Sequence, residues 1–540
     1  MNLLSRLRSL PLLLTTLAAV TSLPAQTPAT TTTTGEPIRV GIRARNGGAD
    51  RLTSLRYVGG FETKTMLLET LVRRGVDGRI VPGLAARWQI LNDGRSFRFE
   101  LRPEAKFHDG TKVTAEAVVT HMKRWVNLPE HNWLLGNQRI TGVTVEDERT
   151  FRVDLDRPYA LLEDLLAINP CAVVAPSSKD WEGEFMRPIG TGPFRFVGAF
   201  DEGKRWRVQK QDGDGPPIDV TFYPRGRDTT PIDDLVAGRI DAFVGGWDED
   251  LPAERLDALQ QQSGFCVQTA PGSSVVYLSF RLTEGPTQDP TIRARIANAI
   301  ARPGLIATIE GGRAEPCTTW AAPTVAFWPR GRQTVRDVPA GATGATDTTP
   351  LPTLKIAAGR AEGRANRAAN AVAEQLRAAG FAVEVLTAPA IAPESPKNVV
   401  DASGAVTPLT TESGEVRAAV GRRIRALSDG ADVRVEITHG MPYCPHQSLV
   451  ARFGTSTDGK LPRGGTAELQ ELVDLAAGEP SEQERLPIYA RVQDLLDREH
   501  LIVPLYVPWR VALHRTEIVG ISLSPDVYHA DLTGLRRDGR

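Results

Sequence analysis

Two short motifs in the first third of the chain decide how it folds. They are Asn92-Asp93-Gly94, which is followed by Phe97-Arg98-Phe99-Glu100-Leu101, and Lys106-Phe107-His108-Asp109-Gly110. Apolar and charged residues alternate between Phe97 and Leu101, and this period of two predicts a strand with one buried face. Asp-Gly pairs suit the positive φ angles of tight turns, so each pair predicts a hairpin and His108 is interpreted as a turn residue.

The regions around these motifs predict a small mixed subdomain. Residues 62–73 carry apolar side chains at helical spacing, and residues 114–126 predict a helix that begins at the N-cap Thr114. Residues 141–145 and 151–155 alternate with period two and predict two further strands.

The second half of the chain also alternates between helix and strand. Residues 291–309 and 365–379 predict amphipathic helices, and Gly380 predicts a stop before a strand at 381–385. The sequence therefore predicts an α/β protein.

Length and composition restrict the classes of function. A chain of 540 residues exceeds what one hydrophobic core supports, so at least two lobes are expected. Its 64 basic and 65 acidic residues are mixed along the chain, which argues against a nucleic-acid partner. Its four cysteines, at positions 171, 266, 317 and 444, are widely spaced and predict neither a disulfide framework nor a zinc knuckle.

The N-terminus predicts export. Arg6 and Arg8 precede an apolar stretch at 10–20, and small residues near 25 form a cleavage site. We expect residues 1–25 to be a cleavable signal peptide, residues 26–37 to be a Thr-rich tether, and the mature protein to be periplasmic.

Further motifs carry a resemblance to a known family. They are residues 78–85 with Trp88, the two motifs above, and residues 188–194, 292–300 and 502–506. In order and spacing they resemble the oligopeptide, dipeptide and nickel-binding receptors of ABC importers, bacterial extracellular solute-binding protein family 5.

The resemblance implies a two-lobed periplasmic binding protein fold of type II, cluster C-like, with an extra subdomain in lobe one. Lobe one, with this inserted subdomain, is expected at residues 38–270, lobe two at 271–501, and a C-terminal return to lobe one at 502–540. The lobes are expected to close on the ligand like a hinge.

The function implied is capture of a small polar ligand, a peptide or a metal chelate, for delivery to an ABC permease and ATPase complex. We expect a monomer without a cofactor. The sequence contains none of the common catalytic motifs, so an enzyme is not expected. The alternatives are a secreted ligand receptor for a sensor system and an ordinary oligopeptide-binding protein without metal.

A segment of lobe two bears on the ligand. Peptide-binding members of the family carry an Asp before a Tyr, which pairs with the peptide's ammonium group, whereas Pro442 precedes Tyr443 here. A buried ammonium without a counter-charge is costly, so this anchor for free-amine peptides is missing. Residues 440–446 instead resemble a Gly-Ala-Pro-Tyr-Asp-Pro-His segment of the nickel-binding members, and residues 131–133 resemble a cleft loop of that branch.

Two positions depart from the nickel-binding pattern. Glu130 and Asn169 stand where that branch has an Arg pair for the carboxylates of a chelate, and Glu reverses the charge. The predicted substrate-binding residues are Phe61, Glu130, Trp133, Asn169, His439 and Tyr443, although the aromatic ones fit a core role equally well. No metal site is predicted, and His439, Cys444 and His446 are the weak candidates for one.

Overall fold

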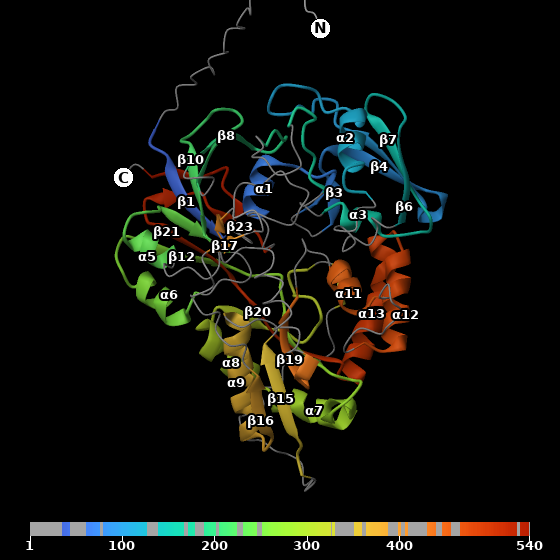
Figure 1. Cartoon of the computed structure of the whole chain (residues 1–540), viewed down its shortest axis with the longest axis vertical. Coiled ribbons are helices and arrows are strands. Elements are labelled where there is room, and N and C mark those ends of the chain that lie inside the picture. The colour runs from blue at the N-terminus through green and yellow to red at the C-terminus, as the bar shows by residue number, and fades with distance from the viewer. Residues whose placement is uncertain are drawn as a thin grey trace, which may run out of the picture.

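Two large β-sheets organise the chain, one in the upper half of Figure 1 and one in the lower half. The helices surround these sheets, and a four-stranded subdomain lies beside the upper sheet (Figure 1). The computed structural model describes residues 35–43, 61–75, 79–126, 139–166, 171–178, 188–200, 205–223, 231–245, 251–325, 327–329, 350–358, 363–386, 398–400, 406–408, 429–438, 445–454, 465–525 and 530–538.

The upper sheet has seven strands and contains β1 (Ile38–Arg43), the first described strand, and β21 (Arg510–Arg515) from the C-terminal part of the chain. β1 pairs in parallel with β10 and β11, and the other pairs are antiparallel. Ile38, Val40 and Ile42 alternate along β1 and are fully buried on one face, as the period of two requires. The strand order is β12 (Phe265–Ala270), β21 (Arg510–Arg515), β11 (Ala242–Val244), β1 (Ile38–Arg43), β10 (Ile218–Tyr223), β9 (Arg205–Lys210) and β8 (Phe194–Phe200).

The lower sheet has six strands and its own core. The helix α9 (Arg364–Ala378) packs its buried Ala368, Val372 and Leu376 along this sheet, because residues four apart share a helix face. The strand order is β14 (Ala314–Pro316), β20 (Ile502–Pro508), β13 (Val276–Phe280), β19 (Val433–Ile437), β15 (Thr353–Ala358) and β16 (Ala382–Leu386).

The subdomain confirms the predicted hairpins. Its strand order is β4 (Ala85–Leu91), β5 (Ser96–Leu101), β7 (Thr150–Leu155) and β6 (Ile140–Val145). Asp93 and Gly94 have φ angles of 52° and 84° at the turn between β4 and β5, as an Asp-Gly turn requires. Thr114 caps α2 by accepting a hydrogen bond from the backbone N–H of Ala117 at 3.2 Å.

Of the four helices predicted, one has nearly the predicted limits, the helix predicted at 114–126 ends early at Met122, and two differ more. The helix predicted at 365–379 is α9, which ends before Gly380, where φ is 94°. The helix predicted at 62–73 ends at Leu67, because the backbone from Leu67 to Leu71 accepts hydrogen bonds from three other segments. The helix predicted at 291–309 is two helices, since Pro303 has no N–H to continue the hydrogen-bond ladder.

The remaining elements are short or surround the sheets. The helices are α1 (Phe61–Leu67), α2 (Ala115–Met122), α3 (Leu161–Asp164), α5 (Pro231–Val236), α6 (Ala253–Gln260), α7 (Pro290–Ala299), α8 (Arg302–Glu310), α9 (Arg364–Ala378), α11 (Pro445–Phe453), α12 (Ala467–Gly478) and α13 (Glu482–Arg498), with 3₁₀ turns η2 (Asn92–Gly94) and η5 (Pro286–Gln288). The two-stranded pairs are β2 (Val72–Arg74) with β3 (Ile80–Pro82), β17 (Asn398–Val400) with β18 (Val406–Pro408), β22 (Ile518–Val519) with β25 (Arg536–Arg537), and β23 (Ser522–Leu523) with β24 (Ala530–Asp531).

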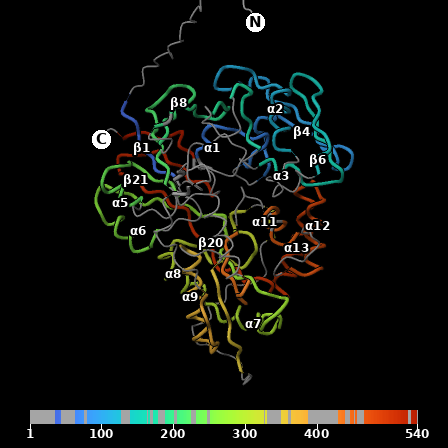
Figure 2. The backbone as a smooth tube through the Cα atoms, in the orientation of Figure 1, coloured from blue at the N-terminus to red at the C-terminus, as the bar shows by residue number. Residues whose placement is uncertain are grey.

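The chain crosses twice between the two large sheets. It leaves the upper sheet after Ala270 and enters the lower one at Val276, and it returns between Pro508 and Arg510 (Figure 2). The two crossings touch, because a Cβ atom at Gly272 would lie 2.2 Å from the carbonyl oxygen of Pro508. Glycine is therefore required where the crossings meet.

The predicted domain limits can be compared with the sheets. The predicted start of lobe two at 271 stays a prediction; that position lies between β12 and β13, where the chain first crosses from the upper to the lower sheet. The predicted return to lobe one at 502 stays a prediction, and the membership of β20 in the lower sheet favours a later return, at Trp509. We call the seven-stranded sheet with the subdomain lobe one, and the six-stranded sheet with α7–α13 lobe two. No helix among the described residues is both long and apolar enough to cross a membrane.

Candidate functional site

The predicted binding residues divide between described and undescribed parts of the chain. Phe61 is the first residue of α1. Glu130, Trp133, Asn169, His439 and Tyr443 lie outside the described residues, as does Cys444. The structure does describe the segments that flank these positions in sequence, and the contacts of those flanking segments are given below.

His108 is a structural residue of the scaffold, as predicted. Its Nδ1 accepts a hydrogen bond from the backbone N–H of Gly190 at 3.3 Å, so its Nε2–H donates to the carbonyl oxygen of Gly192 at 2.9 Å. Burial lowers the pKa of His108, which favours this neutral form. The motifs at 106–110 and 188–194, far apart in sequence, are therefore joined through one imidazole.

The same glycines hold the C-terminal end of α1, the helix that begins at Phe61. A Cβ atom at Gly190 would lie 2.1 Å from the carbonyl oxygen of Leu67, and one at Gly192 would lie 2.5 Å from that of Met66. Lys64, in the middle of α1, is 1 % exposed, and burial lowers its pKa to about 7. A firmly packed helix therefore carries the one predicted binding residue that is described.

A buried carboxyl group lies where the subdomain meets lobe two. Asp164, the last residue of α3, is 2 % exposed, and one of its carboxyl oxygens accepts two hydrogen bonds. Gln447 of α11 donates through Nε2 at 2.9 Å, and Tyr159 donates through its hydroxyl at 3.3 Å. The Cys171 Sγ–H also donates to the main-chain oxygen of Asp164, at 3.5 Å.

His446 completes this lobe junction, which we define as Tyr159, Asp164, His446 and Gln447. The side chain of His446 is fully buried, and its ring lies 6.2 Å from that of Tyr159, centroid to centroid. The guanidinium group of Arg139 lies over the Tyr159 ring at 5.2 Å. In the described part of the chain, no group of His, Cys, Asp and Glu could hold a metal ion. The weak metal candidates His439 and Cys444 stay untested.

A group of half-buried charges lies at the base of the predicted lobe-two binding segment. Glu436 of β19 is 3.0 Å from Arg452 of α11 and 3.6 Å from Arg434. Burial would raise the pKa of Glu436, but the two guanidinium groups hold it below its ordinary value. Glu436 is paired opposite Tyr277 of β13, whose pKa is raised chiefly by burial. This cluster joins β19 to α11, the two elements between which His439 and Tyr443 stand in sequence.

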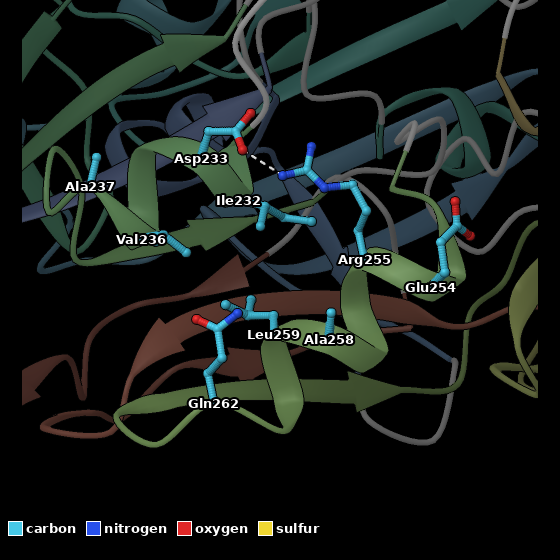
Figure 3. Close-up of a pocket in the computed structure, with 9 residues that line it drawn as sticks. All are labelled: Ile232, Asp233, Val236, Ala237, Glu254, Arg255, Ala258, Leu259 and Gln262. Atoms are coloured by element: carbon cyan, nitrogen blue, oxygen red, sulfur yellow. Dashed lines mark hydrogen bonds and ion pairs between the residues drawn. The ribbon is translucent and has the colours of Figure 1, made fainter.

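A shallow groove occupies the outer surface of lobe one (Figure 3). It measures about 390 Å³, and Arg255 pairs with Asp233 across it. It lies between α5 and α6 and is lined by Ile232, Asp233, Val236, Ala237, Glu254, Arg255, Ala258, Leu259 and Gln262. Because these residues belong to lobe one alone, the groove does not fit a ligand enclosed between lobes.

Three cysteines are described, and none of them forms a disulfide. Cys171 and Cys317 are buried and Cys266 is half-buried, and burial raises the pKa of each thiol. A raised pKa favours the protonated thiol, which is the less nucleophilic form.

Sequence reasoning missed Asp164 and Gln447. Asp164 lies in an apolar stretch, residues 159–167, and an acid there can as easily be exposed as buried. Gln447 directly follows His446, a weak metal candidate, and no sequence motif around Gln447 indicates that it is buried or paired. Only the proximity of α3 and α11 reveals the pair.

The sequence matches a family model. The model, bacterial extracellular solute-binding proteins, family 5 Middle, matches residues 79–409. The nickel-binding periplasmic protein of Escherichia coli K12 is 27 % identical over 276 residues, 49 % of this chain and 52 % of that protein. The glutathione-binding protein GsiB of Pectobacterium atrosepticum is 26 % identical over 249 residues, 44 % of this chain and 47 % of that protein. These matches span about half the length of the curated relatives.

The fold is similar to solved structures over nearly its whole length. NikA from Brucella suis, solved in complex with Fe(III)-EDTA, superposes with a TM-score of 0.73 and 20 % sequence identity. The superposition covers 92 % of this chain and 99 % of that one. This likeness confirms the predicted two-lobed α/β fold.

Proposed function

Because the chain belongs to the bacterial extracellular solute-binding proteins of family 5, we propose that it captures a small polar ligand between its lobes. In this proposal the protein delivers the ligand to an ABC permease and ATPase complex, and it is not an enzyme. The mature protein works in the periplasm as a monomer after a signal peptide at 1–25 is removed.

One structural observation carries the proposal. The two large sheets have separate cores and are joined by two crossings that touch at Gly272 and Pro508. A third core cluster packs the subdomain of lobe one against α11–α13 of lobe two. Two rigid bodies on adjacent connections can rotate toward each other, which is the hinge closure used by ligand-enclosing proteins.

The ligand is a peptide or a metal chelate. Relatives named as nickel-binding and glutathione-binding support both classes. We assign its contacts to Phe61 on α1, Glu130, Trp133 and Asn169 from lobe one, and His439 and Tyr443 from lobe two. Glu130 favours a cationic group on the ligand, because a carboxylate attracts positive charge and repels the anionic arms of a chelate.

Native mass spectrometry of the mature protein, purified from periplasm without chelators, tests the proposal. We expect an adduct, since a closed cleft retains its ligand. A metal-containing adduct identifies a chelate, and a metal-free organic adduct identifies a peptide-like ligand. The proposal is wrong if no adduct is found and neither nickel(II)-histidine nor a panel of short peptides binds in titration calorimetry.

A charge reversal tests the assigned cleft. Glu130→Arg is expected to abolish the adduct or to exchange it for a more anionic one. Glu104→Arg makes the same change of charge at an exposed position of the subdomain and should leave the adduct unchanged. Equal behaviour of the two variants would remove Glu130 from the binding site.

A further inference from the structure

The subdomain is attached to its two neighbours by different kinds of bond. Backbone hydrogen bonds fasten it to the rest of lobe one, from Val173 to Glu69 at 2.9 Å, from Ala175 to Ile189 at 2.9 Å and from His108 to Gly190 at 2.8 Å. These bonds continue the main-chain framework, so the subdomain and the seven-stranded sheet form one body.

The contact with lobe two is made largely by side chains, many of them apolar, since one core cluster contains buried residues of the subdomain and of α11–α13. Among the described residues, the Ala160 N–H donates to the Ala477 carbonyl oxygen at 3.0 Å, while Glu482 of α13 accepts hydrogen bonds from Ile80 and Arg74. The hydrogen bond from Gln447 to Asp164 is also buried, between residues that are 7 % and 2 % exposed. Figure 1 shows α11, α12 and α13 directly beneath the subdomain.

Side-chain bonds can break and re-form without disturbing either backbone, whereas the backbone bonds of the subdomain cannot. The Asp164 carboxyl oxygen keeps its hydrogen bond from Tyr159, which lies on the same side, when Gln447 departs. The junction therefore has a donor that stays and a donor that leaves, and a buried acceptor without either would be costly.

The position of this bond in the chain links it to both predicted binding segments. Asp164 precedes Asn169 by five residues, and Gln447 follows Tyr443 by four. The bond therefore ties the ends of two segments, one from each lobe, that carry predicted ligand contacts.

We propose that the Asp164–Gln447 hydrogen bond is a polar clamp that, together with the apolar packing around it, holds the two lobes together. Asp164 and Gln447 are then positioning residues that raise ligand affinity by stabilising the closed form, without contact with the ligand. This consequence for affinity rests on the proposed function, whereas the clamp itself can be tested without ligand. A ligand that binds only the closed form has its apparent affinity reduced by the fraction of protein that is open.

Hydrogen exchange of the ligand-free full-length mature protein tests the clamp. The Ala160 amide bonds across the junction and reports its opening, and the Val173 amide bonds within lobe one and reports unfolding of that lobe. We expect Gln447→Ala to speed exchange at Ala160 by about 10-fold, the effect of losing one hydrogen bond to a carboxyl group, with Val173 unchanged.

Gln375→Ala is the matched control. Gln375 makes a comparable pair of hydrogen bonds, to the N–H and carbonyl of Ala301, but entirely within lobe two. Its removal should leave exchange at Ala160 unchanged. The clamp is refuted if Gln447→Ala leaves Ala160 exchange as in the wild type, or if Ala160 and Val173 accelerate together.

The two proposals fail separately. If exchange at Ala160 responds as expected but the native mass spectrum and the calorimetry reveal no ligand, the clamp stands and ligand capture is wrong. If a ligand is found but Ala160 exchange does not change, capture stands and the clamp is wrong.

Discussion

Two buried carboxyl groups in this protein have partners of different kinds. Glu310, at the end of α8 in lobe two, is 7 % exposed and pairs with the guanidinium group of Arg364 at 2.6 Å. Asp164, at the lobe junction, is 2 % exposed and accepts hydrogen bonds from two neutral donors, Gln447 and Tyr159. The first pair lies within one lobe, and the second spans two.

The two kinds of partner suit two kinds of contact, one that stays formed and one that opens. Separating a buried ion pair leaves a charge without a partner, which suits a contact that persists in every state of the lobe. A neutral amide can leave a carboxyl group at a smaller cost, because water replaces it on both sides. Neutral donors therefore suit a surface that opens and closes.

The largest expected effect is at the permanent pair. Glu310→Gln keeps the shape of the side chain but removes the carboxylate charge that pairs with the buried Arg364, so we expect the free energy of unfolding to fall by about 3 kcal/mol. Urea denaturation at neutral pH measures the loss. Arg377→Ala removes an exposed arginine of α9 and should change stability by less than about 0.5 kcal/mol. A similar loss in both variants would contradict the role of the buried pair.

A buried charge in lobe one should make stability depend on pH. Burial lowers the pKa of Lys64 to about 7, whereas the unfolded chain keeps the proton up to about 10.5. The unfolded state therefore binds more protons between these values, and the contribution of Lys64 to the unfolding free energy rises with pH there, by at most about 1.4 kcal/mol per unit. Below pH 7 Lys64 is charged in the folded protein as well, so the full cost of burying its charge is present.

Lys64→Met removes this titrating group. We expect the variant to be more stable than the wild type at pH 6 and to lose that advantage toward pH 9, as measured by urea denaturation at both values. A difference between the two proteins that does not change with pH would show that Lys64 does not titrate in this range.

The crossing between the two lobes should tolerate no side chain at Gly272. A methyl group there would meet the carbonyl oxygen of Pro508, so Gly272→Ala is expected to lower the unfolding free energy by about 2 kcal/mol. In Gly304→Ala the new methyl group would lie 3.5 Å from the Gln375 amide, within α8, and should stabilise by about 0.5 kcal/mol. Thermal unfolding of both variants provides the comparison, and equal shifts would contradict a close contact at the crossing.

The matched change at the junction should cost less than that at Glu310. Asp164→Asn retains a side-chain oxygen that accepts from Gln447 and Tyr159, so we expect a loss of about 1 kcal/mol in urea denaturation. The comparison with Glu310→Gln is direct, because both variants replace a carboxyl group by an amide. If Asp164→Asn lowers the unfolding free energy more than Glu310→Gln does, the hydrogen bonds from neutral donors at the junction are not weaker than the buried ion pair.

The smallest effect is expected at an exposed pair of the subdomain. Arg87 donates through Nε to Glu100 at 2.7 Å, and the Arg87 side chain is 74 % exposed. Solvent screens such pairs, so Arg87→Ala should change the unfolding free energy by less than about 0.5 kcal/mol. A larger loss of unfolding free energy would contradict the expectation that an exposed ion pair contributes less to stability than a buried one.

Local patterns predicted much of the fold. The alternation at 97–101, the Asp-Gly turn and the Thr114 cap are found as expected, because each depends on residues a few positions apart. The end of α1 at Leu67 was missed, since it depends on hydrogen bonds from Gly83, Leu84 and Gly192, which are remote in sequence. Of the predicted binding residues, Phe61 alone is among those described, so the site remains a proposal.

The sequence by itself determined the family, the mixed α/β class and the scaffold role of His108, because turn residues, alternation and motif order are local properties of the chain. Only the tertiary structure decided that Asp164 and Gln447 meet, that Glu310 is paired with a buried arginine, and that Gly272 lies against Pro508. These contacts join residues more than 50 positions apart, and no local pattern encodes which remote side chains the packed lobes bring together.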